Sequence, residues 1–226
     1  MLKLKTLIEE GNPEQLATGF QFVEGPVWQA DGSLFFSDIP GNRTYRWTAK
    51  TGATVWREPT GNANGMTLDR QGVLLACEHS GRQVSRIAAD RTATPVADSY
   101  GGKRLNSPND VVVKRDGMIY FTDPAAGRSV VYGIPREQEL SFAGVYRLHP
   151  ATKEVTLLVD DFVLPNGLCF SLDERQLFVN DTRRLHIRVF DVQADGTLAN
   201  GRFWAETPGD GAGVPDGMKF DQGGNI

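Results

Sequence analysis

The sequence has few of the residues from which common catalytic and structural centres are built. It contains two cysteines, Cys77 and Cys169, each inside an apolar run, and three histidines in 226 residues. Two cysteines without paired spacing argue against a disulfide framework or a zinc cluster, so both are expected to be free, buried thiols. Neither a Gly-x-Ser-x-Gly elbow nor a His-Glu-x-x-His motif occurs. These absences argue against the usual serine-hydrolase and zinc-hydrolase machinery.

Long apolar runs and an excess of basic charge are also missing. No apolar run approaches the ~18 residues of a membrane span, and the first 20 residues lack the apolar core and small-residue cleavage site of a signal peptide. Lys and Arg number 24 against 28 Asp and Glu, for a net charge of −4, which gives no electrostatic surface for nucleic acid. We therefore expect a soluble, cytoplasmic protein without nucleic-acid or membrane partners.

Helical periodicity is nearly absent, with weak candidates only at residues 1–10 and 135–140. With 25 Gly and 12 Pro, the composition favours an all-β, turn-rich chain. What the chain does contain is a repeat, in which a polar residue at a Pro- or Gly-marked kink directly precedes an apolar strand. The repeat units begin near residues 23, 62, 107, 164 and 214, and the kink residues are Glu24, Asn64, Asn109, Asn166 and Asp216. Their spacing of 40 to 57 residues is typical of a repeat architecture.

Each unit has the same internal order. A short strand is followed by an Asp-Gly type of turn, as at Asp31-Gly32 and Asp116-Gly117, and by a second apolar strand. Two weaker strands complete the unit, which predicts a four-stranded antiparallel β-propeller blade. Residues 1–226 are expected to form one incomplete propeller domain of a six-bladed type that needs roughly 300 residues. The ring would stay open, with Ile226 at an unpaired strand start and residues 13–20, "PEQLATGF", as an outer strand for the last blade.

The kink residues are expected to meet at one mouth of the central channel, because the first strand of each propeller blade lines it. Two carboxylates and three amides would converge there without a Lys or Arg among them, and unpaired buried carboxylates need a cation, a proton or solvent. Oxygen ligands without Cys or His suit calcium or magnesium. The sequence thus predicts a metal site at Glu24, Asn166 and Asp216. The alternative is that polar turn residues simply belong at a wet channel mouth, which explains Asn64 well and Glu24 poorly.

Several motifs in order resemble the gluconolactonase / regucalcin / luciferin-regenerating-enzyme family: "FVEGPVW", "LFFSDIPGNRTYRW", "RLNSPNDVVV", "IYFTDP", "PNGLCFS" and "VPDGMKFD". The resemblance runs from about residue 16 onward and is greatest for the gluconolactonase branch. It implies a six-bladed propeller with one divalent ion, usually calcium, and magnesium, manganese or zinc as alternatives. By motif, Glu24, Asn166 and Asp216 would be the ligands, and Asn109 would contact the substrate or a water on the metal. The regucalcin branch has an Arg two residues before that asparagine, where this chain has Ser107.

The expected function is metal-dependent hydrolysis of a sugar (aldono) lactone such as gluconolactone. The ion would polarise the lactone carbonyl, and Asp216 is the predicted general base. Asn64 and Asn109 are predicted to contact the substrate. His79 and Asp123 each follow a second strand and are weaker candidates for the same role, a structural role being the alternative; Asp181 is read like Asp123. The competing functions are a lactonase or esterase on a non-sugar ester, and a non-catalytic binding propeller.

Overall fold

The computed structural model describes residues 13–207, 211 and 213–226, and it consists of antiparallel β-sheets. The first four-stranded sheet contains β1 (Val23–Trp28), β2 (Leu34–Asp38), β3 (Arg43–Thr48) and β4 (Gly52–Arg57). The second contains β5 (Ala63–Leu68), β6 (Leu74–Glu78), β7 (Gln83–Ile87) and β8 (Ala93–Ala97). In both sheets the spatial order of the strands is their sequence order, as in a propeller blade.

Two further sheets repeat this arrangement. The third contains β11 (Val111–Val113), β12 (Ile119–Asp123), β13 (Ala143–Leu148) and β14 (Val155–Phe162). The fourth contains β15 (Pro165–Phe170), β16 (Gln176–Asp181), β17 (His186–Val192) and β18 (Leu198–Glu206). A small two-stranded ladder of β9 (Ser99–Tyr100) and β10 (Lys103–Arg104) lies between the second and third blades in the chain.

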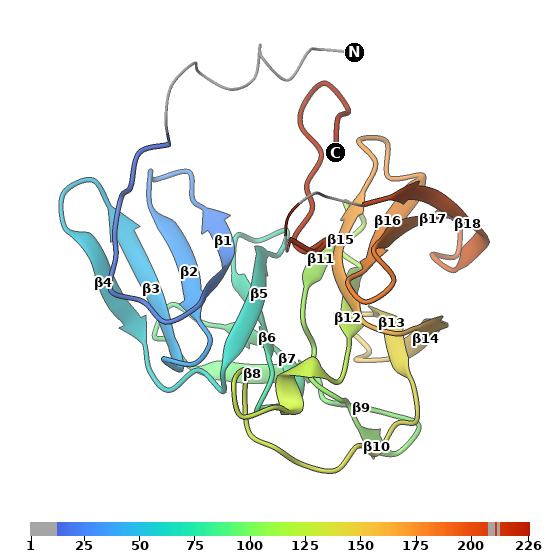
Figure 1. The fold of residues 1–226 in the computed structure, drawn as a ribbon, viewed down its shortest axis with the longest axis horizontal. Helices are drawn as coiled ribbons and strands as arrows, with labels where there is room; N and C mark the ends of the chain where they lie inside the picture. Colours follow the sequence, from blue (N-terminus) through green and yellow to red (C-terminus); the bar gives the residue numbers. More distant parts are fainter. Residues whose placement is uncertain (1–12, 208–210, 212) are drawn as a thin grey trace.

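The four blades follow one another along an open arc, with β1–β4 at one end and β15–β18 at the other (Figure 1). The first strands lie innermost, where β1 contacts β5, β5 contacts β11, and β11 contacts β15. Apolar clusters join neighbouring blades: Val27 and Leu74 belong to one cluster, Leu75 and Val111 to a second, and Tyr120 and Leu168 to a third. Burial between blades is therefore what fixes the first strands relative to one another.

The predicted kinks are β-bulges in three of the four blades. The pairing register shifts between Glu24 and Val27 in β1, between Ala63 and Met66 in β5, and between Pro165 and Leu168 in β15. A bulge re-aims a side chain out of the regular pleat. In the third blade the kink residue Asn109 lies outside the ladder, because β11 begins only at Val111. The kinks thus turn polar side chains away from the strand pattern while the apolar run behind them stays in the core.

The predicted fifth strand is wrong. No strand forms in residues 213–226, because no neighbouring strand in the described part of the chain pairs with them. The segment instead packs Met218 and Phe220 against Cys169 and Phe178 of the fourth blade. The predicted outer strand at residues 13–20 likewise joins no sheet.

Of the two weak helix candidates, residues 135–140 are not helical and residues 1–10 lie outside the described residues. The described chain has one 3₁₀ turn, η2 (Ala126–Arg128). That turn opens an excursion, residues 124–142, between β12 and β13. No helix within the described residues has the length and apolar character that crossing a membrane requires.

Candidate active site

One cavity of about 210 Å³ collects the kink residues of all five repeat units. It is lined by Glu24, Asn64, Asn109, Asn166 and Asp216. The three asparagines are more than nine-tenths buried, while Asp216 is exposed. The structure therefore brings together the whole set that the repeat predicts, from four blades and the segment after them.

A hydrogen bond repeated from blade to blade holds the backbone of this set. The next-to-last residue of a second strand donates to the carbonyl oxygen of the kink residue in the following unit. The bonds run from Ser37 Oγ to Asn64 (2.9 Å), from Thr122 Oγ1 to Asn166 (2.8 Å) and from Asn180 Nδ2 to Asp216 (2.5 Å). The second blade has Cys77 at that position, and there the carbonyl oxygen of Asn109 accepts from the main-chain N–H of Gly65 at 2.8 Å.

Glycine after the kink allows these backbones to approach closely. A β-carbon on Gly65 would lie 2.5 Å from the carbonyl oxygen of Asn109, and one on Gly25 or Gly167 would collide with the carbonyl oxygen of the next kink residue. Gly25 also has a φ of +56°, which other residues adopt only at a cost. The motif glycines thus close the wall of the cavity.

His79 orients the amide of Asn64. The buried ring of His79 accepts from Asn64 Nδ2 at Nε2 (3.1 Å) and donates from Nδ1 to the carbonyl oxygen of Tyr132 (2.9 Å). Burial lowers the pKa of His79 to about 4, so the ring is neutral and can play both parts. His79 itself does not line the cavity. His79 lies behind Asn64, a candidate substrate contact. It binds the amide nitrogen of Asn64, which leaves the amide oxygen free to contact a substrate.

Asn166 is held in the same way by the fourth blade. Its amide nitrogen donates to Thr182 Oγ1 at 3.0 Å, and that hydroxyl donates to the carbonyl oxygen of Pro215 at 2.8 Å. Among the described residues the amide oxygen of Asn166 accepts no hydrogen bond. Thr182 therefore connects one predicted metal ligand to the segment that carries another, Asp216.

The carboxyl groups of Glu24 and Asp216 form an uncompensated acidic pair. Burial, the charge of Asp216, the charge of Asp110 and a hydrogen bond with Asp216 raise the pKa of Glu24 to about 7, against a hydrogen bond from the Gly25 N–H that lowers it. In the described part of the chain, no Lys or Arg lies within ion-pair distance of either carboxyl group. Such a pair binds a cation or a shared proton.

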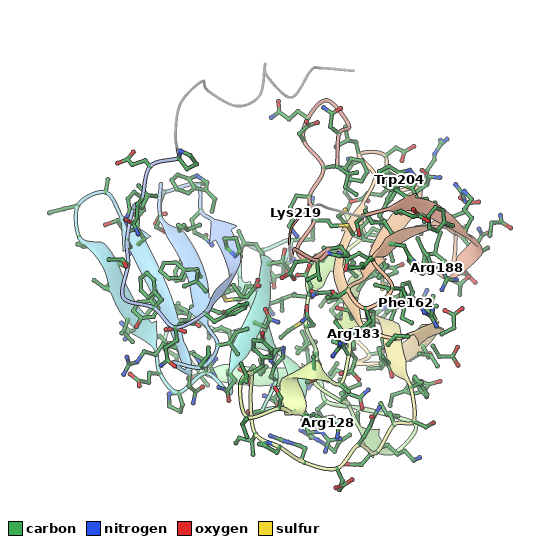
Figure 2. The ribbon with its side chains drawn as sticks, viewed as in Figure 1. Arg128, Phe162, Arg183, Arg188, Trp204 and Lys219 are labelled. Atoms are coloured by element: carbon green, nitrogen blue, oxygen red, sulfur yellow. The ribbon has the colours of Figure 1, made fainter. Side chains whose placement is uncertain are left out.

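Two charged residues of the cavity, Asp110 and Lys219, were not predicted. Asp110 is buried beside Asn109 and accepts from the N–H groups of Val111 (2.8 Å) and Leu168 (3.4 Å). Lys219 lies at the cavity near the centre of the molecule (Figure 2) and opposes the burial that raises the pKa of Asp110. Lys219 thus adds a basic side chain to a cavity whose five kink residues include none. The sequence could have indicated Asp110, because it stands after Asn109 where the other four kink residues are followed by glycine.

Asp123 lies outside the cavity, in a position that fits the structural role given as its alternative. It is fully buried and accepts from the main-chain N–H groups of Asn106 (2.8 Å) and Ser107 (2.7 Å), and burial raises its pKa to about 7. Asp38 and Asp181 accept from the chain before β1 and β15 in the same way. The acidic residue that ends each of these second strands therefore holds, by main-chain hydrogen bonds, the segment that leads into the kink of the same blade.

Ser107 also has a structural position. Its hydroxyl donates to the carbonyl oxygen of Pro124 and accepts from the N–H of Gly127 at 3.0 Å. The side chain is fully buried and faces the start of the excursion, so it does not supply the substrate contact of the regucalcin-branch arginine.

The donor set fits a hard divalent cation. Within residues 13–207, 211 and 213–226 no group of three or more His, Cys, Asp or Glu side chains is positioned to hold a metal. The predicted ligands are of a mixed kind, two carboxylates and an amide oxygen, which is the chemistry calcium accepts. In the described chain the acidic pair has no Lys or Arg within ion-pair distance, and the amide oxygen of Asn166 accepts no hydrogen bond, so these oxygens can take a cation without the loss of an ion pair.

Fold and site together define a β-propeller with an acid- and amide-lined cavity where its blades converge. Residues 22–226 match the family described as SMP-30/Gluconolactonase/LRE-like region, and the chain belongs to that family. The fold-class prediction, a propeller of the six-bladed type with four-stranded antiparallel blades, is confirmed by the four blades and by the structural likeness below.

Three relatives illustrate the match. A gluconolactonase of Zymomonas mobilis is 33% identical over 248 residues, covering 99% of this chain and 69% of that protein. The pentonolactonase XacC of Haloferax volcanii is 28% identical over 219 residues, covering 92% and 66%. The solved structure of XC5397 from Xanthomonas campestris, described as a gluconolactonase, is 39% identical with a TM-score of 0.84, covering 91% and 68%. The chain spans about two thirds of the length of these relatives.

Proposed function

We propose that the chain carries the site of a divalent-cation-dependent lactonase that opens sugar (aldono) lactones to their acids. The observation that carries the proposal is the cavity in which Glu24 and Asp216 meet beside the amides of three asparagines, with no Lys or Arg of the described chain within ion-pair distance of either carboxyl group. The Zymomonas mobilis gluconolactonase and the Xanthomonas campestris structure described as a gluconolactonase, both more than 30% identical to this chain, support the same reaction class.

Glu24, Asn166 and Asp216 would hold the ion, calcium by ligand chemistry. A cation bound there polarises a lactone carbonyl and eases deprotonation of a nearby water. Asp216 is the proposed general base, because it is the exposed carboxylate of the pair and therefore the one that solvent reaches. Asn109, whose side chain makes no hydrogen bond in the described chain, would position the lactone. Asn64, held by His79, would present its amide oxygen to a sugar hydroxyl.

A binding propeller without catalysis is the alternative class, because propellers host many functions. Holding two carboxyl groups close together is unfavourable, as the raised pKa of Glu24 shows. A protein that only binds partners through its faces does not need such a pair. A lactonase of non-sugar esters would share the same carboxylates and differ in the substrates it accepts.

The test is hydrolysis of a lactone panel by the 226-residue chain, followed with a pH indicator, with and without chelator. Sugar lactones should be hydrolysed, chelation should abolish the activity, and calcium should restore it. Activity unaffected by chelator would exclude a metal-dependent reaction. Inactivity on every lactone with metal present would favour the binding propeller.

The role of Asp216 needs its own pair of variants. Asp216→Asn keeps an oxygen ligand but cannot accept a proton, so it should bind metal when the ion is in excess and lose ~10²–10⁴-fold in kcat. Asp216→Ala should lose both activity and metal affinity. Activity of the Asn variant within a few-fold of wild type at saturating metal would remove Asp216 as the base.

A further inference from the structure

A second cavity, of about 670 Å³, is lined largely by the excursion between β12 and β13. Its charged lining residues are Arg128, Arg136, Glu137 and Arg183. Three guanidinium groups against one carboxylate reverse the sign of a chain whose net charge is −4. Figure 2 shows that Arg128 comes from the excursion while Arg183 comes from the turn after β16.

The charges of these arginines are not neutralised by the fold. Among the described residues none of the three has an Asp or Glu within ion-pair distance. Arg128 donates only to neutral acceptors, the carbonyl oxygen of Arg136 (2.5 Å) and Gln138 Oε1 (3.1 Å), and its buried Nε has no partner. Arg136 donates from Nε to the carbonyl oxygen of Ile134 at 3.1 Å. Within the described residues the Arg183 side chain makes no hydrogen bond.

Neighbouring arginines show the contrast. Arg82 is paired with Glu139 at 2.7 Å, and Arg104 with Asp98 at 2.6 Å. Arg82 and Arg104, which do not line the second cavity, are thus ion-paired, whereas the three arginines that line it have no ion-pair partner in the described chain. Burial and the charges of Arg82, Arg104 and Arg128 lower the pKa of Arg136, because burial and neighbouring positive charges both disfavour its charged form.

The second cavity adjoins the first through two short connections. Tyr132 lines it, and the carbonyl oxygen of Tyr132 holds the His79 ring that orients Asn64. Arg183 follows Thr182, whose hydroxyl holds the amide of Asn166. Lining residues of the two cavities are thus connected through the ring of His79 and through Thr182.

We propose that Arg128, Arg136 and Arg183 form an oxyanion-binding site, for a phosphate or carboxylate group, beside the lactone cavity. Guanidinium groups suit this ligand because they offer fixed pairs of N–H donors that match phosphate and carboxylate oxygens. The group can come from two sources. It is either an acidic substituent of the lactone, an assignment that rests on the proposed function, or a separate anion.

The first measurement is calorimetric titration of inorganic phosphate into the 226-residue chain, without any lactone. Arg183→Gln and Arg136→Gln should each weaken phosphate binding about tenfold or more, since a lost hydrogen bond to a charged group has that scale. Glu137→Gln should strengthen it by removing the one opposing charge. Arg70→Gln, which removes an exposed arginine from the β5–β6 turn, is the matched control and should change nothing.

No binding of phosphate, or binding that the Arg183 and Arg136 variants leave unchanged, would overturn the oxyanion site. Arg128→Gln is a poorer choice because Arg128 also ties the excursion together. Circular dichroism and thermal unfolding should show that Arg183→Gln folds as wild type, since its side chain holds no other residue.

The second measurement assigns the source by comparing kcat/KM for neutral glucono-δ-lactone with that for its 6-phosphate. If the substituent occupies the site, Arg183→Gln lowers kcat/KM for the phosphorylated lactone about tenfold and leaves the neutral one unchanged. If both stay unchanged while phosphate binding falls, the site takes a separate anion. Failure to hydrolyse any lactone would refute the proposed function, and the phosphate titration would still decide the oxyanion site.

Discussion

Asn180 donates a hydrogen bond from Nδ2 to the main-chain carbonyl oxygen of Asp216 at 2.5 Å. Asn180 is fully buried, and its Oδ1 has no partner among the described residues. A buried acceptor without a donor costs about 1–3 kcal/mol. The fold therefore retains at this position a residue that is costly for stability and that holds the segment bearing the proposed base.

Replacing Asn180 should separate that positioning from stability. Asn180→Thr restores the donor type found at Thr122, whereas Asn180→Val has the same shape without a hydroxyl. We expect the Val variant to unfold at a temperature similar to the Thr variant but to bind calcium more weakly and hydrolyse lactone more slowly. The measurements are thermal unfolding and calorimetry on both variants. Equal calcium affinity in the pair would show that the bond does not position Asp216.

Glu24→Gln should weaken calcium binding, because it removes one of two formal charges while keeping an oxygen at nearly the same place. Titration calorimetry is the measurement, and Glu137→Gln, outside the cavity of the kink residues, is the control for a general loss of negative charge. If calcium affinity were unchanged in Glu24→Gln, we would withdraw Glu24 as a ligand.

Asn109→Ala should raise KM and leave the metal in place. Its side chain lines the cavity without holding any other group, so its removal takes away a substrate contact and little structure. Steady-state kinetics at saturating calcium, paired with a calcium titration, checks both halves. A loss of calcium affinity as large as that in Glu24→Gln would make Asn109 a ligand instead.

Stability should fall with acidification through His79. The folded pKa is about 4 against 6.5 for the free side chain, so the unfolded chain binds more protons between these values. The contribution of neutral His79 to the free energy of unfolding is complete above pH 6.5. It is lost as the pH falls toward 4, and the total loss is about 3 kcal/mol. His79→Gln should flatten this part of the dependence of unfolding free energy on pH, measured by urea denaturation. An unchanged slope in a variant that folds at pH 7 would contradict the assignment.

The repeat predicts much of this molecule because its signals are local. A kink, an apolar strand and an Asp turn recur within a few residues of each other, and they place Glu24 and Asn166 at equivalent points of separate blades. Bulges at those points turn the side chains inward, so the convergence of the kink residues follows from the repeat.

Other features depend on contacts that the repeat does not contain. Lys219 lines the cavity, and its neighbours Met218 and Phe220 pack on the fourth blade in a segment that forms no strand. A strand pattern without a partner strand does not become a strand, which is why the fifth unit was predicted wrongly. Asp123 fits the pattern of a cleft residue equally well, and only its hydrogen bonds to Asn106 and Ser107 reveal its structural role.

The arginines of the second cavity had no periodic signal at all. Arg128 and Arg136 lie in an excursion outside the repeat, and Arg183 lies in a turn after β16. Their proximity comes from how the excursion folds back over blade two, where Ser80 accepts from the N–H of Ile134 at 3.1 Å.

The turn at Asp221 forms without a sheet around it. Asp221 Oδ1 accepts from the N–H groups of Gly223 (2.8 Å) and Asn225 (2.9 Å), as Asp69 does in the β5–β6 turn. These turns are thus closed by five residues of their own and need no neighbouring blade. Because short loops and hairpins close in microseconds or less, each hairpin can nucleate while the chain is still emerging from the ribosome. Blades would then be added in order, and each new kink would form its hydrogen bond with the blade that folded before it.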